Sequence, residues 1–289
     1  MTEKEGVEAL NLEVEHQIAM ADRNKTTRVE HLRAEHDAIN GIRVYKHRSI
    51  ALTCMLISYS VMRIFSTSWP NFFPTLFWSV FMYFYIDFYG GLLHFVLDWE
   101  ENLSFPPISA ACLEFLWHHR IPRDITSQPF YEVIGALNTL ATVKLCVTFA
   151  VKIFVALSQR VFMQSWTLIF AWGYLWAVVG QWSHRQAHTA PLKRPWWTVA
   201  LQNTGILLDP RAHKAHHDAA FEEPHKANFG RTYPILHGRS GLLLEKLLNA
   251  VPNGAFWTFV WLFLTIFDVF IFSYVFDSTS RIVLSGLGQ

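Results

Sequence analysis

The chain has 289 residues, of which 52% are hydrophobic and 16% are charged, against about 25% charged residues in a typical soluble domain. A net charge of +1 excludes the basic footprint of a nucleic-acid-binding protein, and the apolar content excludes a disordered chain. The three cysteines are scattered and odd in number, so they predict no disulfide framework.

Residues 1–49 differ in composition from the rest, because they hold nine acidic and eight basic residues and no apolar run. They lack the apolar core of a secretory signal, and they are too acidic for an organelle presequence. We interpret them as a charged N-terminal extension, which leads to a domain at 50–254 and a C-terminal helix and tail at 255–289.

Five long apolar stretches follow, and a helix of about 20 residues is needed to cross a bilayer. They predict an all-α integral membrane protein with about five transmembrane helices. A soluble helical core is less favoured, because soluble core helices rarely run over 20 residues without a polar face. The stretches lie at roughly residues 50–66, 72–97, 133–157, 162–182 and 255–276.

With five spans, residues 1–49, 98–132 and 183–254 fall on one side of the membrane. These regions hold 19 of the 24 Lys and Arg residues. Positive charge favours the cytosolic, matrix or stromal side. We therefore expect a histidine-rich cap on that side, in the endoplasmic reticulum or in an inner membrane of a mitochondrion or plastid.

The cap contains closely spaced histidines. On a helix, residues three or four positions apart share a face, so such groups can point donors in one direction. Imidazole binds iron, copper and zinc, and the donors exceed what one four-coordinate zinc needs, so two metal ions fit better. The isolated His237 is assigned a structural role. The predicted metal-binding residues are His94, Asp98, His118, His119, His184, His188, His213, His216, His217 and His225.

Four of these segments resemble the Kua-type lipid desaturases in order and spacing. They read GGLLHFVLDW (90–99), WHHRIPRDIT (117–126), GQWSHRQAH (180–188) and LQNTGILLDPRAHKAHH (201–217). That family includes plasmanylethanolamine desaturases of animals and bacteria and plastid phosphatidylglycerol acyl desaturases of plants, and the resemblance covers about residues 75–248. It implies a diiron centre held by the matching residues His94, Asp98, His118, His119, His184, His213, His216 and His217.

The chain departs from the family pattern in two places. Gly180 stands where members usually have a histidine four residues before the one matched by His184, and 127–138 contains no histidine. His188 lies on the same helical face as Gly180 and is expected to compensate, with Glu132 and His225 as further suppliers of a ligand. The insertion at 218–224 also loosens the register of His225.

The resemblance implies a membrane diiron lipid desaturase, which would use O₂ and two external electrons to introduce a double bond into an acyl or alkyl chain. Its partners would be a membrane lipid and an electron donor such as cytochrome b5 or ferredoxin. The alternative is a scaffold subunit that has lost catalysis and docks on a membrane complex through 1–49. A metal transporter is less favoured, because its ligands would lie within the membrane rather than at the ends of the apolar segments.

Overall fold

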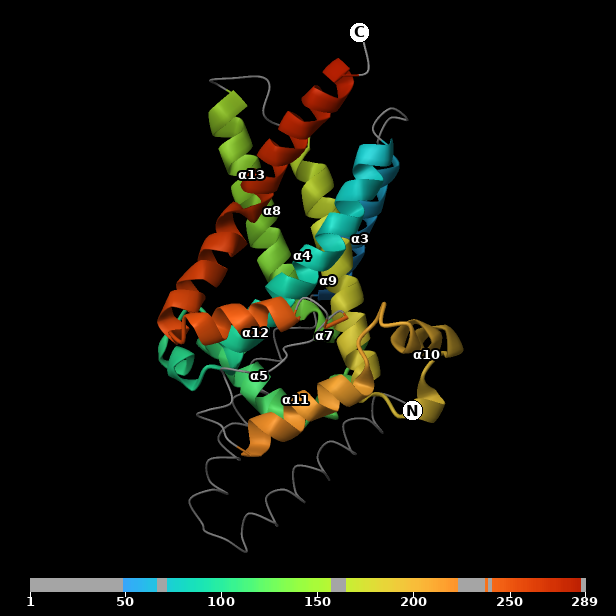
Figure 1. Cartoon of the computed structure of the whole chain (residues 1–289), viewed down its shortest axis with the longest axis vertical. Coiled ribbons are helices and arrows are strands. Elements are labelled where there is room, and N and C mark those ends of the chain that lie inside the picture. Colours follow the sequence, from blue (N-terminus) through green and yellow to red (C-terminus); the bar gives the residue numbers. More distant parts are fainter. Residues whose placement is uncertain (1–48, 67–71, 157–164, 223–236, 239–240, 287–289) are drawn as a thin grey trace, which may run out of the picture.

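A computed structural model describes residues 49–66, 72–156, 165–222, 237–238 and 241–286, and all regular structure in these ranges is helical (Figure 1). This confirms the all-α prediction for the described part of the chain. The elements are α3 (Ser49–Phe65), α4 (Phe72–Asp98), η3 (Glu100–Ser104), α5 (Ser109–Arg120), α6 (Asp124–Ser127), α7 (Phe130–Val133), α8 (Gly135–Ala156), α9 (Trp166–His188), η4 (Pro191–Lys193), α10 (Trp196–Asn203), α11 (Pro210–Glu222), α12 (Gly241–Ala250) and α13 (Gly254–Gly286).

Two of these helices are long and apolar enough to cross a membrane, through Thr75–Asp98 in α4 and Gly254–Ser278 in α13. The apolar segments of α3 and α8 are shorter, at Ile50–Phe65 and Gly135–Val151. Five transmembrane helices are therefore not confirmed. The helix α9 does not pass this test because its last residues, up to His188, are polar and leave a shorter apolar part.

The long helices α3, α4, α8, α9 and α13 form a bundle, and the shorter helices α5, α10, α11 and α12 gather at one end of it (Figure 1). A core beside that end joins α4 to α12 and α13, through buried Leu92, Phe95, Leu244 and Trp257. The helices α4 and α9 approach closely at Gly173, where an added Cβ would lie 3.0 Å from Met82 Cε. This packing brings the C-terminal ends of α4 and α9 together at the cap.

A buried ion pair joins α8 to α13 within the bundle. Lys144 Nζ lies 2.6 Å from Asp268 Oδ2, and the Tyr85 hydroxyl of α4 donates to the same oxygen at 2.7 Å. The Asp268 side chain is only 5% exposed. Removing one member of such a pair leaves an uncompensated charge, which costs about 3–5 kcal/mol of stability.

Asp268→Ala is therefore expected to lower the thermal unfolding midpoint of the purified protein by about 5–10 °C. The matched control replaces all three groups by apolar ones, with Lys144→Met, Asp268→Leu and Tyr85→Phe. That triple variant should recover most of the loss, because no buried charge remains. Equal midpoints for the single and triple variants would show that the ion pair does not set the effect.

Candidate metal centre

The helices α4 and α9 each present two donors on the last turns that reach the cap. His94 and Asp98 of α4 are four residues apart, and so are His184 and His188 of α9. Residues at this spacing lie one above the other on a helix. The close contact of α4 with α9 places the rings of His94 and His184 6.0 Å apart, so the two pairs face a common volume.

The helices α5 and α11 each contribute two adjacent histidines. Consecutive residues on an α-helix point about 100° apart, since 3.6 residues make one turn. His118 and His119 of α5 therefore point to different sites, as do His216 and His217 of α11. Each adjacent pair supplies one side chain to each of two donor groups.

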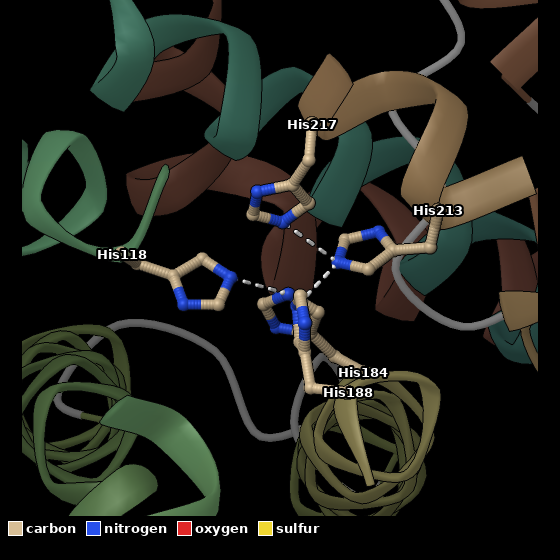
Figure 2. A group of neighbouring side chains, drawn as sticks. All are labelled: His118, His184, His188, His213 and His217. Atoms are coloured by element: carbon tan, nitrogen blue, oxygen red, sulfur yellow. Dashed lines mark hydrogen bonds between the residues drawn. The ribbon is translucent and has the colours of Figure 1, made fainter. Parts of the chain in front are cut away.

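The first donor group, which we call the five-histidine group, draws on α5, α9 and α11 (Figure 2). The ring nitrogens of its members face one another, with an Nε2 to Nε2 distance of 3.0 Å between His118 and His184 and of 2.7 Å between His213 and His188. The donor atoms all lie within 4.8 Å of one another. The members are His118, His184, His188, His213 and His217.

The second donor group, which we call the Asp98 group, contains the carboxylate of Asp98 with His94, His119 and His216. Asp98 Oδ2 lies 2.6 Å from His94 Nδ1, and Asp98 Oδ1 lies 3.1 Å from His119 Nε2. His216 Nε2 lies 3.9 Å from Asp98 Oδ2. One carboxylate and three imidazoles therefore surround a single point.

The two groups adjoin. The ring of His119 stacks on the ring of His217 with centroids 4.5 Å apart, and the rings of His213 and His216 lie 5.8 Å apart. The arrangement can therefore hold two metal ions side by side.

Four histidines of the five-histidine group are in the protonation state that metal binding requires. Burial and the surrounding histidines hold the pKa of His118, His213 and His217 well below the usual range, and burial lowers the pKa of His188 to about 3. These four imidazoles are therefore neutral near pH 7, with lone pairs available to a metal ion.

The nitrogens of the five-histidine group also fit a cation better than they fit one another. A hydrogen bond between two neutral imidazoles needs one donor and one acceptor, and five converging nitrogens cannot all be satisfied in this way. Nε2 of His213 lies 2.7 Å from Nε2 of His188 and 3.1 Å from Nε2 of His217, so a single ring nitrogen faces two others. A metal ion accepts a lone pair from every member at once.

Two hydrogen bonds fix the chain that leads into α11. Ser183 of α9 accepts a hydrogen bond from the backbone N–H of Leu208 at 2.8 Å, and the Tyr83 hydroxyl donates to the carbonyl of Ile206, also at 2.8 Å. These bonds tie the segment before α11 to both long helices. They set the position from which α11 delivers its three histidines.

Nine of the ten predicted ligands thus come together in the two groups, and His225 lies outside the described residues. Glu132 of α7 is buried but belongs to neither group. His237 also lies outside both, because its ring stacks on Tyr83 at 4.4 Å and its Nε2 lies 3.4 Å from Asp87 Oδ2. Helical spacing alone places His213, His216 and His217 on one side of their helix, whereas the structure assigns His216 to the Asp98 group.

A pocket reaches the five-histidine group from the side of α5, α6 and α9. His118 and His184 form part of its wall, so it connects the candidate centre with the surroundings. The sequence analysis did not predict Glu114 and Asp124 as pocket residues, because each is a single acidic residue that belongs to no recognisable motif. The polar residues that line it are Glu114, Asp124, Gln128 and Gln181.

Comparison with known proteins agrees with this site. Fatty acid desaturase 4-like 1, chloroplastic, of Arabidopsis thaliana is 27% identical over 180 residues, which cover 61% of this chain and 55% of that protein. Fatty acid desaturase 4, chloroplastic, of the same plant is 30% identical over 165 residues, covering 57% and 46%. Plasmanylethanolamine desaturase 1 of Mus musculus is 29% identical over 150 residues, covering 50% and 51%.

The chain spans about half the length of the curated relatives it matches, and no solved structure matches it. Residues 83–251 match the family model of the lipid desaturase domain, and this range contains every residue of the two donor groups. The chain therefore belongs to the lipid desaturase domain family, which confirms the Kua-type resemblance of its four histidine-rich segments.

Proposed function

We propose that this protein is a membrane diiron lipid desaturase that introduces a double bond into a lipid acyl or alkyl chain, with O₂ and two external electrons. The observation that carries the proposal is the pair of adjoining donor groups, which supply nine donors from four helices. Neutral imidazoles with one carboxylate suit iron, and two groups in contact suit a dinuclear centre. His225 is proposed as a further ligand because it follows the histidines of α11 closely in the chain.

Two bound iron ions would supply the O₂-dependent removal of hydrogen from unactivated carbon, which acid and base side chains cannot perform. The side chains of the protein would fix the positions of the ligands around the two iron ions. Asp98 contacts His94 and His119 and so orients both rings, while Ser183 and Tyr83 fix the segment that leads to α11. Glu114 and Asp124 line the pocket beside His118, where protons consumed by O₂ reduction can enter.

We also propose that α3, α4, α8, α9 and α13 all cross the membrane, with the cap on the cytosolic, matrix or stromal side. The exposed surfaces of α4 and α13 support this, since Phe77 is 67% exposed and Phe259 is also 67% exposed. A membrane lipid is the substrate and a small redox protein such as cytochrome b5 or ferredoxin is the donor. The compartment is the endoplasmic reticulum or an organelle inner membrane.

The scaffold alternative rested on Gly180 and on the absence of histidine from 127–138. The position of His188 supports the enzyme proposal, because its Nε2 lies 2.7 Å from that of His213 in the five-histidine group. The group therefore has five donors without a histidine at position 180. Residues 1–49 remain proposed as an arm that contacts a partner.

The proposal is tested by purifying the full chain after growth with excess iron. We expect about two iron ions per chain, and an unsaturated lipid product that appears only with O₂ and a reductant. The variant with both His119→Ala and His217→Ala, one from each group, is the matched control and should give neither. A folded wild-type protein that contains no iron would exclude the enzyme and leave the scaffold.

A further inference from the structure

Large apolar side chains stand exposed beside the bundle, outside the helices proposed to cross the membrane. Leu192 of η4 is 100% exposed and Trp196, the first residue of α10, is 82% exposed. Transfer of such side chains out of water is favourable, so they mark a surface that another phase or molecule covers.

A second exposed apolar stripe runs along α12. Leu243, Leu247 and Val251 lie at intervals of four residues and are all exposed, and Leu243 is 57% exposed. A neighbouring face of α12 is already packed, because Leu244 and Leu248 are fully buried in the core with α4 and α13. The stripe is therefore an apolar face additional to the one that folding requires.

The two helices lie across the long axis of the bundle, at similar heights and on opposite sides of it (Figure 1). α11 lies at the same end of the bundle and farther from the long helices than α10 and α12 do (Figure 1). The long helix α13 starts at Gly254, four residues after the end of α12. The level of α10 and α12 is thus also the level at which α13 enters the bundle.

α10 is held in this orientation by contacts with the bundle. The ring of Trp197 stacks on that of Trp182 in α9, with centroids 6.1 Å apart and planes 9° apart. After the C-terminal end of α10, the Tyr83 hydroxyl donates a hydrogen bond to the carbonyl of Ile206 and so fixes the chain there. The bundle therefore holds α10 in place while the side chain of Trp196 stays exposed.

The chemistry of the two surfaces matches the boundary between water and lipid. Tryptophan collects at this boundary, and lysine extends its ammonium from an apolar stem toward the phosphates. Exposed Lys193 accompanies Trp196, and exposed Lys246 accompanies Leu247. By contrast, α11 exposes the ion pair of Lys214 with Asp218, whose side chains are 73% and 56% exposed, which is typical of a surface in water.

We propose that α10 and α12 are interfacial helices that lie in the head-group layer of the bilayer, one on each side of the bundle. The metal centre then lies between this layer and the water-facing helix α11. This inference rests on the proposed embedding of the bundle in a membrane. It commits to a lipid surface as the occupant of both apolar faces.

The test measures the depth of single nitroxide labels on the full chain in nanodiscs of phosphatidylcholine and phosphatidylglycerol. Cys54 and Cys146 are exposed and are first replaced by alanine, while the buried Cys112 stays. Labels are placed at Trp196→Cys and Leu243→Cys. Ile266→Cys, on an exposed side chain at the middle of the apolar span of α13, is the reference for lipid, and Lys214→Cys is the reference for water.

Collision with O₂ reports the lipid phase, and collision with a water-soluble nickel chelate reports the aqueous phase. We expect the labels at 196 and 243 to have an O₂ to nickel collision ratio several-fold above that at 214 and several-fold below that at 266. The two ratios should agree with each other. Leu192→Cys repeats the measurement beside α10 if Trp196→Cys fails to fold, because the Leu192 side chain is wholly exposed.

Each other result has a separate meaning. If 196 and 243 match 214 while 266 remains in lipid, the interfacial helices are excluded and the membrane bundle stands. If 266 also matches 214, the membrane embedding itself is wrong. If 196 or 243 is immobile and shielded from both reagents, a protein or a second copy of the chain covers the face, and the lipid proposal is overturned.

Discussion

His118→Ala and His119→Ala are expected to remove iron from different parts of the centre, although the two residues are neighbours in the chain. His118 belongs to the five-histidine group and His119 to the Asp98 group. Loss of a partner that only orients a ligand costs about 10–100-fold in metal affinity or activity, and loss of a ligand itself should cost more. We therefore expect product formation to fall by more than about 100-fold in each variant.

The iron content should separate the two groups. We expect each variant to retain about one ion, with the remaining ion in a different environment, as measured by iron analysis and Mössbauer spectroscopy. His216→Ala should resemble His119→Ala, and His217→Ala should resemble His118→Ala, because each pair shares a group. Lys214→Ala on the outer face of α11 is the control and should keep both ions. Identical spectra for all four histidine variants would argue against two separate groups.

His188→Ala is expected to reduce iron binding strongly, even though family members usually carry a histidine at the position of Gly180 instead. Its Nε2 lies 2.7 Å from that of His213, and its ring lies 4.8 Å from the ring of His217. Removal of the imidazole deletes one donor of the five-histidine group, and no other residue of α9 takes its place there. We expect product formation to fall by more than about 100-fold.

A histidine introduced at position 180 should not rescue that variant. Residues 180 and 188 are about two turns apart on α9, which is about 12 Å along the helix axis. The double variant His188→Ala with Gly180→His should therefore stay low in iron. Full iron content in His188→Ala alone would show that His188 is not a ligand, and rescue by Gly180→His would show that the centre accepts a donor from the deeper turn.

The sequence was sufficient to propose the candidate donors, because helical spacing is a local property. The spacing of His94 with Asp98 and of His184 with His188 predicted donors on one helical face without knowledge of the neighbours. The long apolar stretches likewise predicted a helical protein, because the pattern was independent of the contacts that each helix makes. The four histidine-rich segments indicated the family for the same reason.

The tertiary structure decided what depends on residues far apart in the chain. The separation of His118 from His119, and of His216 from His217, arises because adjacent side chains diverge on a helix and meet donors from different partner helices. Lys144 and Asp268 are 124 residues apart, so only packing shows that each buried charge has a partner. The orientation of α10 and α12 across the bundle is also set by packing, through Trp182 and the core beneath α12, and no local pattern contains it.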